Sequence, residues 1–87
     1  MEEKALIPIA QTDITIAGFP ITAVLLPDDQ TGEVFDMFCK ALDLQTHYQI
    51  HRIHNDPVLF DSLALVALET PGGTQRINVI YTWALPL

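Results

Sequence analysis

Hydrophobic and polar residues alternate along the first third of the chain, as they do in β-strands. Two isoleucines lie on one face and alternate with polar or small residues over residues 13–18, which predicts a strand. A second strand is predicted over residues 21–26, which are rich in branched side chains. Gly18 tolerates a positive φ and Pro20 suits the start of a strand, so we expect a tight reversal there. The two segments form a predicted N-terminal β-hairpin.

The pattern changes from a strand period to a helix period at Asp36. A polar loop over residues 27–32 and a short returning strand over residues 33–35 precede this change. From Asp36 onward, apolar residues recur at steps of three and four, which predicts a short amphipathic helix with Asp36 as its N-cap. These apolar residues are Met37, Phe38, Ala41, Leu42 and Leu44.

A second short helix is expected one or two residues after the first. Thr46 and Gln49 have the spacing of a capping box, in which each side chain accepts a hydrogen bond from a backbone N–H group at the start of the helix. Pro57 disfavours helical backbone at the residue before it, so the helix is predicted to end near Asn55. Ile50 and Ile53 are expected to face the core from this helix.

The last third of the chain again predicts strands. Residues 63–68 are apolar at every position, which is typical of a central strand covered on both faces. Pro71 and Gly72 form a predicted type II turn, in which Gly72 supplies the positive φ. Hydrophobic and polar residues alternate over residues 77–83. The predicted fold is a single α+β domain over residues 1–87, with an N-terminal β-hairpin, two short adjacent helices and a C-terminal β-hairpin.

Composition narrows the classes of protein to which this chain can belong. Eleven acidic residues face four basic ones, which gives a formal net charge of −7, while 49% of residues are apolar and 17% are charged. The low charge content excludes a disordered chain, and the scarcity of basic residues argues against a generic basic nucleic-acid-binding module. Cys39 is the only cysteine, so a disulfide scaffold is excluded and a buried free thiol is expected. No secretory signal or membrane-spanning stretch is recognisable, so we expect a cytoplasmic protein.

Three histidines of the second predicted helix are the candidates for metal binding. His47, His51 and His54 fall within an arc of about 60° on the helix, and histidines spaced i, i+4 can bind zinc. No fourth ligand is evident in the sequence, so we favour a solvated polar face over a metal site, with a pH-sensitive surface as an intermediate alternative. No pattern of a catalytic centre or phosphate-binding loop is recognisable, so neither a catalytic residue nor a cofactor is predicted. A metal-binding or thiol enzyme is the remote alternative.

The helix predicted over residues 46–55 also suggests a role in binding DNA. Two short helices with a tight connection have the outline of a helix-turn-helix, and Arg52 and Asn55 are side-chain types that can read base edges. The four basic residues allow few phosphate contacts, and a body of net charge −7 repels a duplex. We therefore expect at most weak DNA binding by a single chain.

Apolar residues exceed what one small core can hide, and the excess is concentrated near the C-terminal end. It lies in the strand at 63–68 and in the last residues, 83–87. This distribution predicts either a homo-oligomer built through the C-terminal hairpin or a following segment that covers the hairpin. The predicted interface residues are Leu63, Leu65, Trp83, Leu85 and Leu87.

Several stretches of the chain, taken in order, resemble a known family. They are Phe38 to Leu44, Gln49 to Ile53, Asp56 to Leu59, Gly72 to Arg76 and Leu85 to Leu87, preceded by Ile7-Pro8 and the strand from Ile21 to Leu25. This ordered set resembles the N-terminal domain of bacteriophage antirepressor proteins, which is related in outline to the N-terminal domain of Bro-type proteins. In that family the leucine-proline-leucine stretch leads into a further segment, whereas the given sequence stops at Leu87. Three alternatives are therefore open: an excised fragment, a prophage gene product truncated at its C-terminal end, or a stand-alone module.

The resemblance implies a role in phage or prophage gene regulation. Antirepressors inactivate a lysogeny repressor by binding it, whereas Bro-type N-terminal domains are associated with DNA. We therefore expect a module that binds a repressor or related regulatory protein in the bacterial cytoplasm, with DNA binding by the helix at 46–55 as the alternative. The candidate partner- or DNA-binding residues are Gln49, His51, Arg52, His54, Asn55, Gln75 and Arg76.

Overall fold

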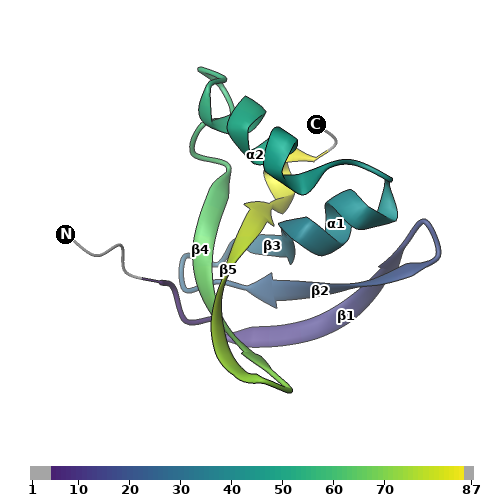
Figure 1. The fold of residues 1–87 in the computed structure, drawn as a ribbon. Coiled ribbons are helices and arrows are strands. Elements are labelled where there is room, and N and C mark those ends of the chain that lie inside the picture. Colours follow the sequence, from purple (N-terminus) through teal and green to yellow (C-terminus); the bar gives the residue numbers. More distant parts are fainter. Residues whose placement is uncertain (1–4, 86–87) are drawn as a thin grey trace.

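The computed structural model describes residues 5–85 of the chain and has the α+β fold that the sequence predicts. A β-hairpin stands at each end of the described chain, and a pair of short helices lies between the hairpins (Figure 1). The elements, in order, are β1 (Ala10–Ile16), β2 (Phe19–Leu25), β3 (Thr31–Val34), α1 (Phe35–Ala41), α2 (Thr46–His54), β4 (Leu63–Thr70), β5 (Gly73–Tyr81) and the 3₁₀ helix η1 (Thr82–Ala84). Neither α1 nor α2 is long enough to cross a membrane, and the described residues contain no helix that is.

The five strands form one antiparallel sheet in the order β1-β2-β3-β5-β4. The prediction that residues 63–68 form a central strand is wrong, because β4 lies at one end of this order. The N-terminal segment covers part of the outer edge of β4. There the Leu6 N–H donates to the Leu65 carbonyl and the Ala67 N–H donates to the Leu6 carbonyl, both at 2.8 Å.

Side chains are buried on both faces of this sheet, although the buried residues of β4, Val66 and Leu68, share one face. Val79 and Ile80 are consecutive residues of β5, so their side chains point to opposite faces, and each belongs to a different cluster. We call the first cluster the helix-side core; it consists of Ile21, Phe35, Phe38, Cys39, Ile53, Ile80 and Ala84. The second, the opposite core, consists of Val24, Leu26, Val34, Val66, Leu68 and Val79.

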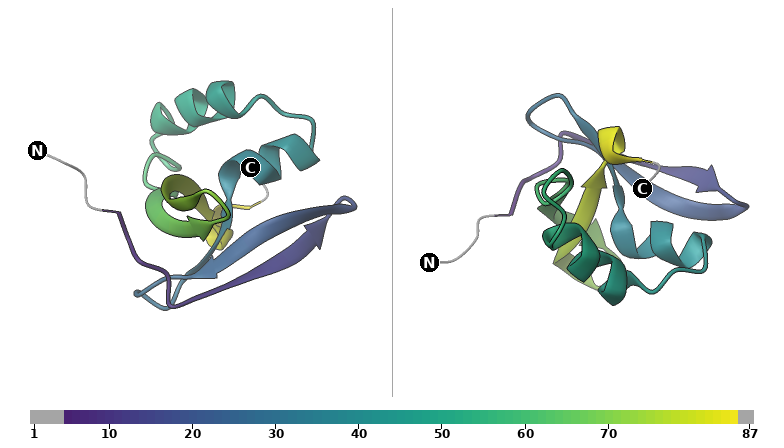
Figure 2. Two further views of the ribbon diagram at one scale, coloured as in Figure 1. Left: turned by 60° about the horizontal axis from the view of Figure 1, so that its bottom comes forward. Right: turned by 90° about the horizontal axis from the view of Figure 1, so that it is seen from above.

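The sheet is strongly bent, and the helices pack into the bend. The two hairpins run in different directions, and α1 lies in the angle between β2 and β5 (Figure 1). Both helices lie on the same side of the β1–β2 hairpin (Figure 2). Met37 of α1 packs against both cores, because α1 follows β3 with no intervening loop.

The helices begin in a different way from the prediction. The N-cap of α1 is Val34, so Asp36 lies inside the first turn and is not the predicted N-cap. α2 starts at Thr46 with Gln45 as its N-cap, and no side chain of the described residues caps either helix. The predicted capping box is wrong because the Thr46 hydroxyl donates instead to Asp36 Oδ1, at 2.7 Å.

The connection between the helices is longer than predicted, whereas α2 ends where the sequence predicts. Residues 42–45 separate α1 from α2, so the connection is longer than the one or two residues expected. α2 ends at His54 with Asn55 as its C-cap, as Pro57 predicts. Ile53 is buried and Ile50 packs against the helix-side core, so both face inward as expected.

Both hairpin turns use left-handed backbone. Gly18 has the positive φ that the sequence predicts, although the reversal lies at residues 17–18 and not at residues 18–20. The N-terminal reversal is a two-residue turn at Ala17 and Gly18, with φ of 53° and 83°. Positive φ at both central residues is the requirement of a type I′ turn. In the C-terminal turn the left-handed residue is Gly73, with φ of 103°, and not the predicted Gly72.

Replacing Ala17 by asparagine is expected to stabilise the fold by about 0.5–1 kcal/mol. A left-handed conformation is unfavourable for alanine, whereas Asn-Gly is the preferred pair for a type I′ turn. Denaturant titration of the variant measures the gain in free energy of unfolding.

Asp43 is also left-handed, with φ of 57°, and its replacement by alanine is expected to be destabilising.

Candidate functional site

The exposed surface of α2 carries most of the residues predicted to bind a partner. His51, Arg52, His54 and Asn55 are exposed on this helix. Gln49 is buried, with 7% of its surface exposed, so its prediction as a surface binding residue is wrong. Its Oε1 accepts a hydrogen bond from Arg52 Nη1 at 3.3 Å. Gln49 therefore positions the Arg52 guanidinium and is not itself available to a partner.

The three histidines of α2 are exposed, in keeping with the solvated polar face that the sequence favours. Within residues 5–85, no three His, Cys, Asp or Glu side chains converge closely enough to hold a metal ion. Asn55 Nδ2 lies 2.9 Å from the His51 carbonyl oxygen and donates to it. The Asn55 amide is therefore partly used in closing the end of α2.

The two remaining predicted binding residues, Gln75 and Arg76, lie on a different part of the molecule. Both are exposed on β5 close to the turn of the C-terminal hairpin. This turn lies at the end of the sheet away from α2 (Figure 1). The predicted residues therefore belong to two separate surfaces and do not form one site.

The thiol of Cys39 is unsuited to nucleophilic catalysis. Cys39 is fully buried in the helix-side core, and burial is the main cause that raises the pKa of its thiol. A nucleophilic cysteine needs the opposite, a lowered pKa and an accessible sulfur. This position agrees with the interpretation of Cys39 as a small buried hydrophobic residue.

Asp36 connects the two helices through charged hydrogen bonds. Its carboxylate lies 2.9 Å from Lys40 Nζ and also accepts the Thr46 hydroxyl. The hydrogen bond with Lys40, followed by that with Thr46, lowers the pKa of the Asp36 carboxyl. Lys40 is therefore already paired within the chain and is less free to contact a partner.

The residues predicted to form an oligomer interface are partly used in the fold itself. Leu63 and Leu85 are half-buried and pack against the helix-side core, and Leu65 is half-buried on β4. Trp83 is 52% exposed and stacks on Tyr81, with 6.3 Å between ring centroids. Leu87 lies outside the described residues. Among the four members that the structure describes, Trp83 therefore presents most surface to a partner, and the homo-oligomer stays a prediction.

The bend of the sheet creates a cleft that the sequence does not predict. We call it the hairpin cleft; its volume is about 340 Å³, and it separates the β1–β2 hairpin from the turn of the β4–β5 hairpin. Its apolar lining comes from Val34, Met37, Leu68, Pro71 and Ile77, and its polar lining from Gln11, Asp13, Thr22, Glu69 and Thr70.

Two carboxylates of the hairpin cleft are held in place by hydroxyl groups. Asp13 Oδ1 accepts from the Thr22 hydroxyl at 3.1 Å, and Glu69 Oε1 accepts from the Thr74 hydroxyl at 2.6 Å. Each carboxylate keeps further lone pairs for a ligand. Asp13 and Glu69 are 56 residues apart in sequence, so only the bend of the sheet brings them to one cleft.

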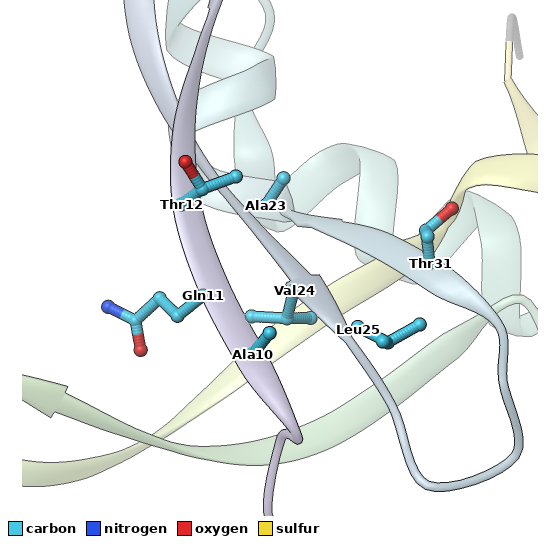
Figure 3. Close-up of a pocket in the computed structure, with 7 residues that line it drawn as sticks. All are labelled: Ala10, Gln11, Thr12, Ala23, Val24, Leu25 and Thr31. Atoms are coloured by element: carbon cyan, nitrogen blue, oxygen red, sulfur yellow. The ribbon is translucent and has the colours of Figure 1, made fainter.

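A second hollow, which we call the apolar trough, lies on the other face of the β1–β2 hairpin. It has a volume of about 180 Å³ and is lined by Ala10, Gln11, Thr12, Ala23, Val24, Leu25 and Thr31. These residues belong to the start of β1, the end of β2 and the first position of β3, and the Gln11 side chain extends to the outer side of β1 (Figure 3). The trough and the hairpin cleft thus flank β1 on its two faces.

Comparison of the chain with protein-family models, with curated proteins and with solved structures finds no match.

Proposed function

We propose that this chain is a protein-binding regulatory module of the antirepressor kind, which binds a basic DNA-binding protein. The hairpin cleft is the observation that carries this proposal. Its apolar floor includes Met37, Leu68 and Ile77, and its carboxylates are Asp13 and Glu69. Lysine and arginine side chains have the matching chemistry, because an apolar stem ends in a positive head.

The charge of the whole chain supports the same kind of partner. A net charge of −7 attracts a basic surface over a distance of about 8–10 Å at physiological salt. DNA-binding proteins carry such surfaces, because they must neutralise phosphate groups. An acidic module that occupies this surface competes directly with DNA. This mechanism agrees with the resemblance to antirepressor N-terminal domains.

Affinity capture from bacterial lysate, followed by an operator-binding assay, tests this function. The immobilised chain is expected to retain a basic DNA-binding protein, and the purified pair should show reduced operator binding in a gel-shift assay. The double variant Asp13→Asn/Glu69→Gln is expected to bind that protein about tenfold more weakly, because it keeps the hydroxyl contacts but loses both charges. The double variant Asp43→Asn/Asp61→Asn is the matched control, since it removes two exposed charges outside the cleft.

Two results of these assays would contradict the proposal. If the captured protein still binds its operator fully in the presence of excess chain, the chain does not act by sequestration. If the chain itself binds operator duplex more tightly than any protein, the DNA-binding alternative replaces the proposal.

That second candidate function has one observation in its favour. α2 places Arg52 beside His51 and His54 on an exposed surface, which could contact phosphate groups. Replacing Arg52 by alanine would then weaken duplex binding uniformly across sequences and reduce the salt slope by about one. Unchanged duplex affinity in this variant would exclude α2 as a DNA-binding helix.

A further inference from the structure

The outer edge of β1 is open to an additional strand. β1 is the first strand of the sheet order and pairs only with β2 among the described residues. Its residues from Ala10 to Thr15 are all exposed. The strand contains neither proline nor lysine, the residues that commonly protect edge strands from pairing.

The hairpin geometry fixes which backbone groups point outward. Ile16 and Phe19 flank the two-residue turn and form a hydrogen-bonded pair, so every second residue of β1 bonds to β2. The residues between them, Gln11, Asp13 and Thr15, direct their N–H and C=O groups to the open edge. Pro20 is consistent with this register. It lies opposite Thr15 in a pair without hydrogen bonds, so its missing N–H group costs no hydrogen bond between β1 and β2.

A strand added to this edge would place its side chains alternately on the two faces of β1, next to the β1 residues that line the two hollows. One set would lie beside Gln11 and Asp13, which line the hairpin cleft. The other set would lie beside Ala10 and Thr12, which line the apolar trough. The first environment favours basic side chains and the second favours apolar ones.

We propose that β1 binds an extended segment of a basic partner by strand addition, and that this segment alternates basic and apolar residues. The inference rests on the proposed function and specifies how the partner is held. Backbone hydrogen bonds to Gln11, Asp13 and Thr15 supply affinity, and the two flanking hollows supply specificity.

Charge argues for a basic partner over a second copy of this chain. Two copies of β1 could pair antiparallel with Thr12, Asp13 or Ile14 lying opposite the same residue of the other copy. In each of these registers the two Asp13 carboxylates would lie on the same face of the sheet, within about 8 Å of each other. Such pairing also joins two bodies that each carry a net charge of −7. A basic strand reverses both of these unfavourable interactions.

Binding of designed peptides to the full chain tests the proposal. The probe is an acetylated ten-residue peptide of alternating lysine and valine, and the comparison peptide has the same composition with the five lysines placed before the five valines. Calorimetry is expected to show about tenfold tighter binding of the alternating peptide. NMR hydrogen exchange is expected to show new protection at the amides of Gln11, Asp13 and Thr15.

Backbone variants separate strand addition from simple charge attraction. Gln11→Pro and Gln11→Ala both lack the glutamine side chain, but only the proline variant lacks the outward N–H group. Gln11→Pro is expected to bind the alternating peptide about tenfold more weakly than Gln11→Ala. Thr15→Pro and Thr15→Ala provide the same comparison if Gln11→Pro does not fold.

The outcomes distinguish this inference from the function on which it rests. Equal affinity for the two peptides, or equal affinity of the proline and alanine variants, overturns strand addition even if a basic protein is still captured. A dimer in light scattering that Thr15→Pro dissociates shows that a second copy occupies the edge, and this also overturns the proposal. If no basic protein is captured but the peptide pattern and the proline effect are both observed, the edge proposal holds and the regulatory function fails.

Discussion

Replacing Gly32 by alanine is expected to lower the free energy of unfolding by about 3 kcal/mol. Gly32 is buried in β3, where it pairs with Val24 on one side and Tyr81 on the other. A Cβ atom at this position would collide with the Val79 side chain and lie 2.9 Å from the Ile80 carbonyl oxygen. The carbonyl belongs to the backbone of a paired strand, so the collision can be relieved only by separating β3 from β5.

The effect is large because β3 alone connects the two hairpins within the sheet. β3 pairs with β2 over three residues and with β5 over three, and all of them lie within one short strand. A loss of about 3 kcal/mol corresponds to a fall in Tm of about 12–24 °C for a domain of this size. Urea titration and thermal unfolding measure both quantities.

Gly72 offers a matched control for this substitution. A Cβ atom at Gly72 would have its nearest neighbour at 3.6 Å, the Gln75 side-chain nitrogen, which is an ordinary contact. Its backbone is not left-handed, so Gly72→Ala is expected to be neutral or slightly stabilising. Equal stability of the Gly32→Ala and Gly72→Ala variants would contradict the packing of β3 described above.

The sequence predicts the elements of this fold well because most of them follow from local patterns. Alternation identifies β1 and β5, branched side chains identify β2, and Pro57 locates the end of α2. The start of each helix is less predictable. Asp36 and Thr46 are both good cap residues by type, but they hydrogen-bond to each other and so join the two helices. Whether such a side chain caps its own helix or bonds to a neighbouring helix depends on tertiary contacts, which the local sequence does not show.

The place of β4 in the sheet shows a second limit. A strand that is apolar at every position is typical of the sheet centre, yet β4 is an outer strand. Val66 and Leu68 are buried on one face, in the opposite core, whereas the other face is half-buried and packs against the helix-side core at Leu63. Leu6 pairs with part of the edge of this strand. A continuous apolar pattern therefore does not show that one face is buried and the other only half-buried, nor which elements cover each face.

The hairpin cleft could not be predicted from the sequence either, because it depends on contacts between elements that are far apart in the chain. Asp13 and Glu69 belong to different hairpins, and their joint position depends on the bend of the sheet. One helix and a family resemblance supply the predicted binding residues, and the structure places Arg52 on α2 and Arg76 on β5. Long-range curvature therefore decides which polar residues form a common surface.

The replacement of Thr82 by valine is expected to lower the free energy of unfolding by about 2 kcal/mol. The Thr82 hydroxyl lies 2.8 Å and 3.1 Å from the two carboxylate oxygens of Glu33 and donates to this group. It also accepts from the Thr31 hydroxyl at 2.9 Å. Glu33 is only 7% exposed, so the variant leaves a buried carboxylate without this donor.

This contact fastens the end of the described chain to the centre of the sheet. Thr82 begins η1, whose Ala84 belongs to the helix-side core, and Glu33 lies on β3 at a distance of 49 residues in sequence. Loss of the contact should therefore release η1 as well as destabilise the sheet. Denaturant titration measures the stability, and Trp83 fluorescence reports on the environment of η1.

A double-mutant cycle shows whether the carboxylate is the cause. Valine and threonine have nearly the same shape, so Thr82→Val removes the hydroxyl with little change in packing, and Thr82→Ser keeps the hydroxyl as a control. In a Glu33→Gln background the acceptor is neutral, and the cost of Thr82→Val is expected to fall to about 1 kcal/mol. An unchanged cost in that background would show that η1 is held by packing of Ala84 and Leu85, and that the charge of Glu33 plays no part.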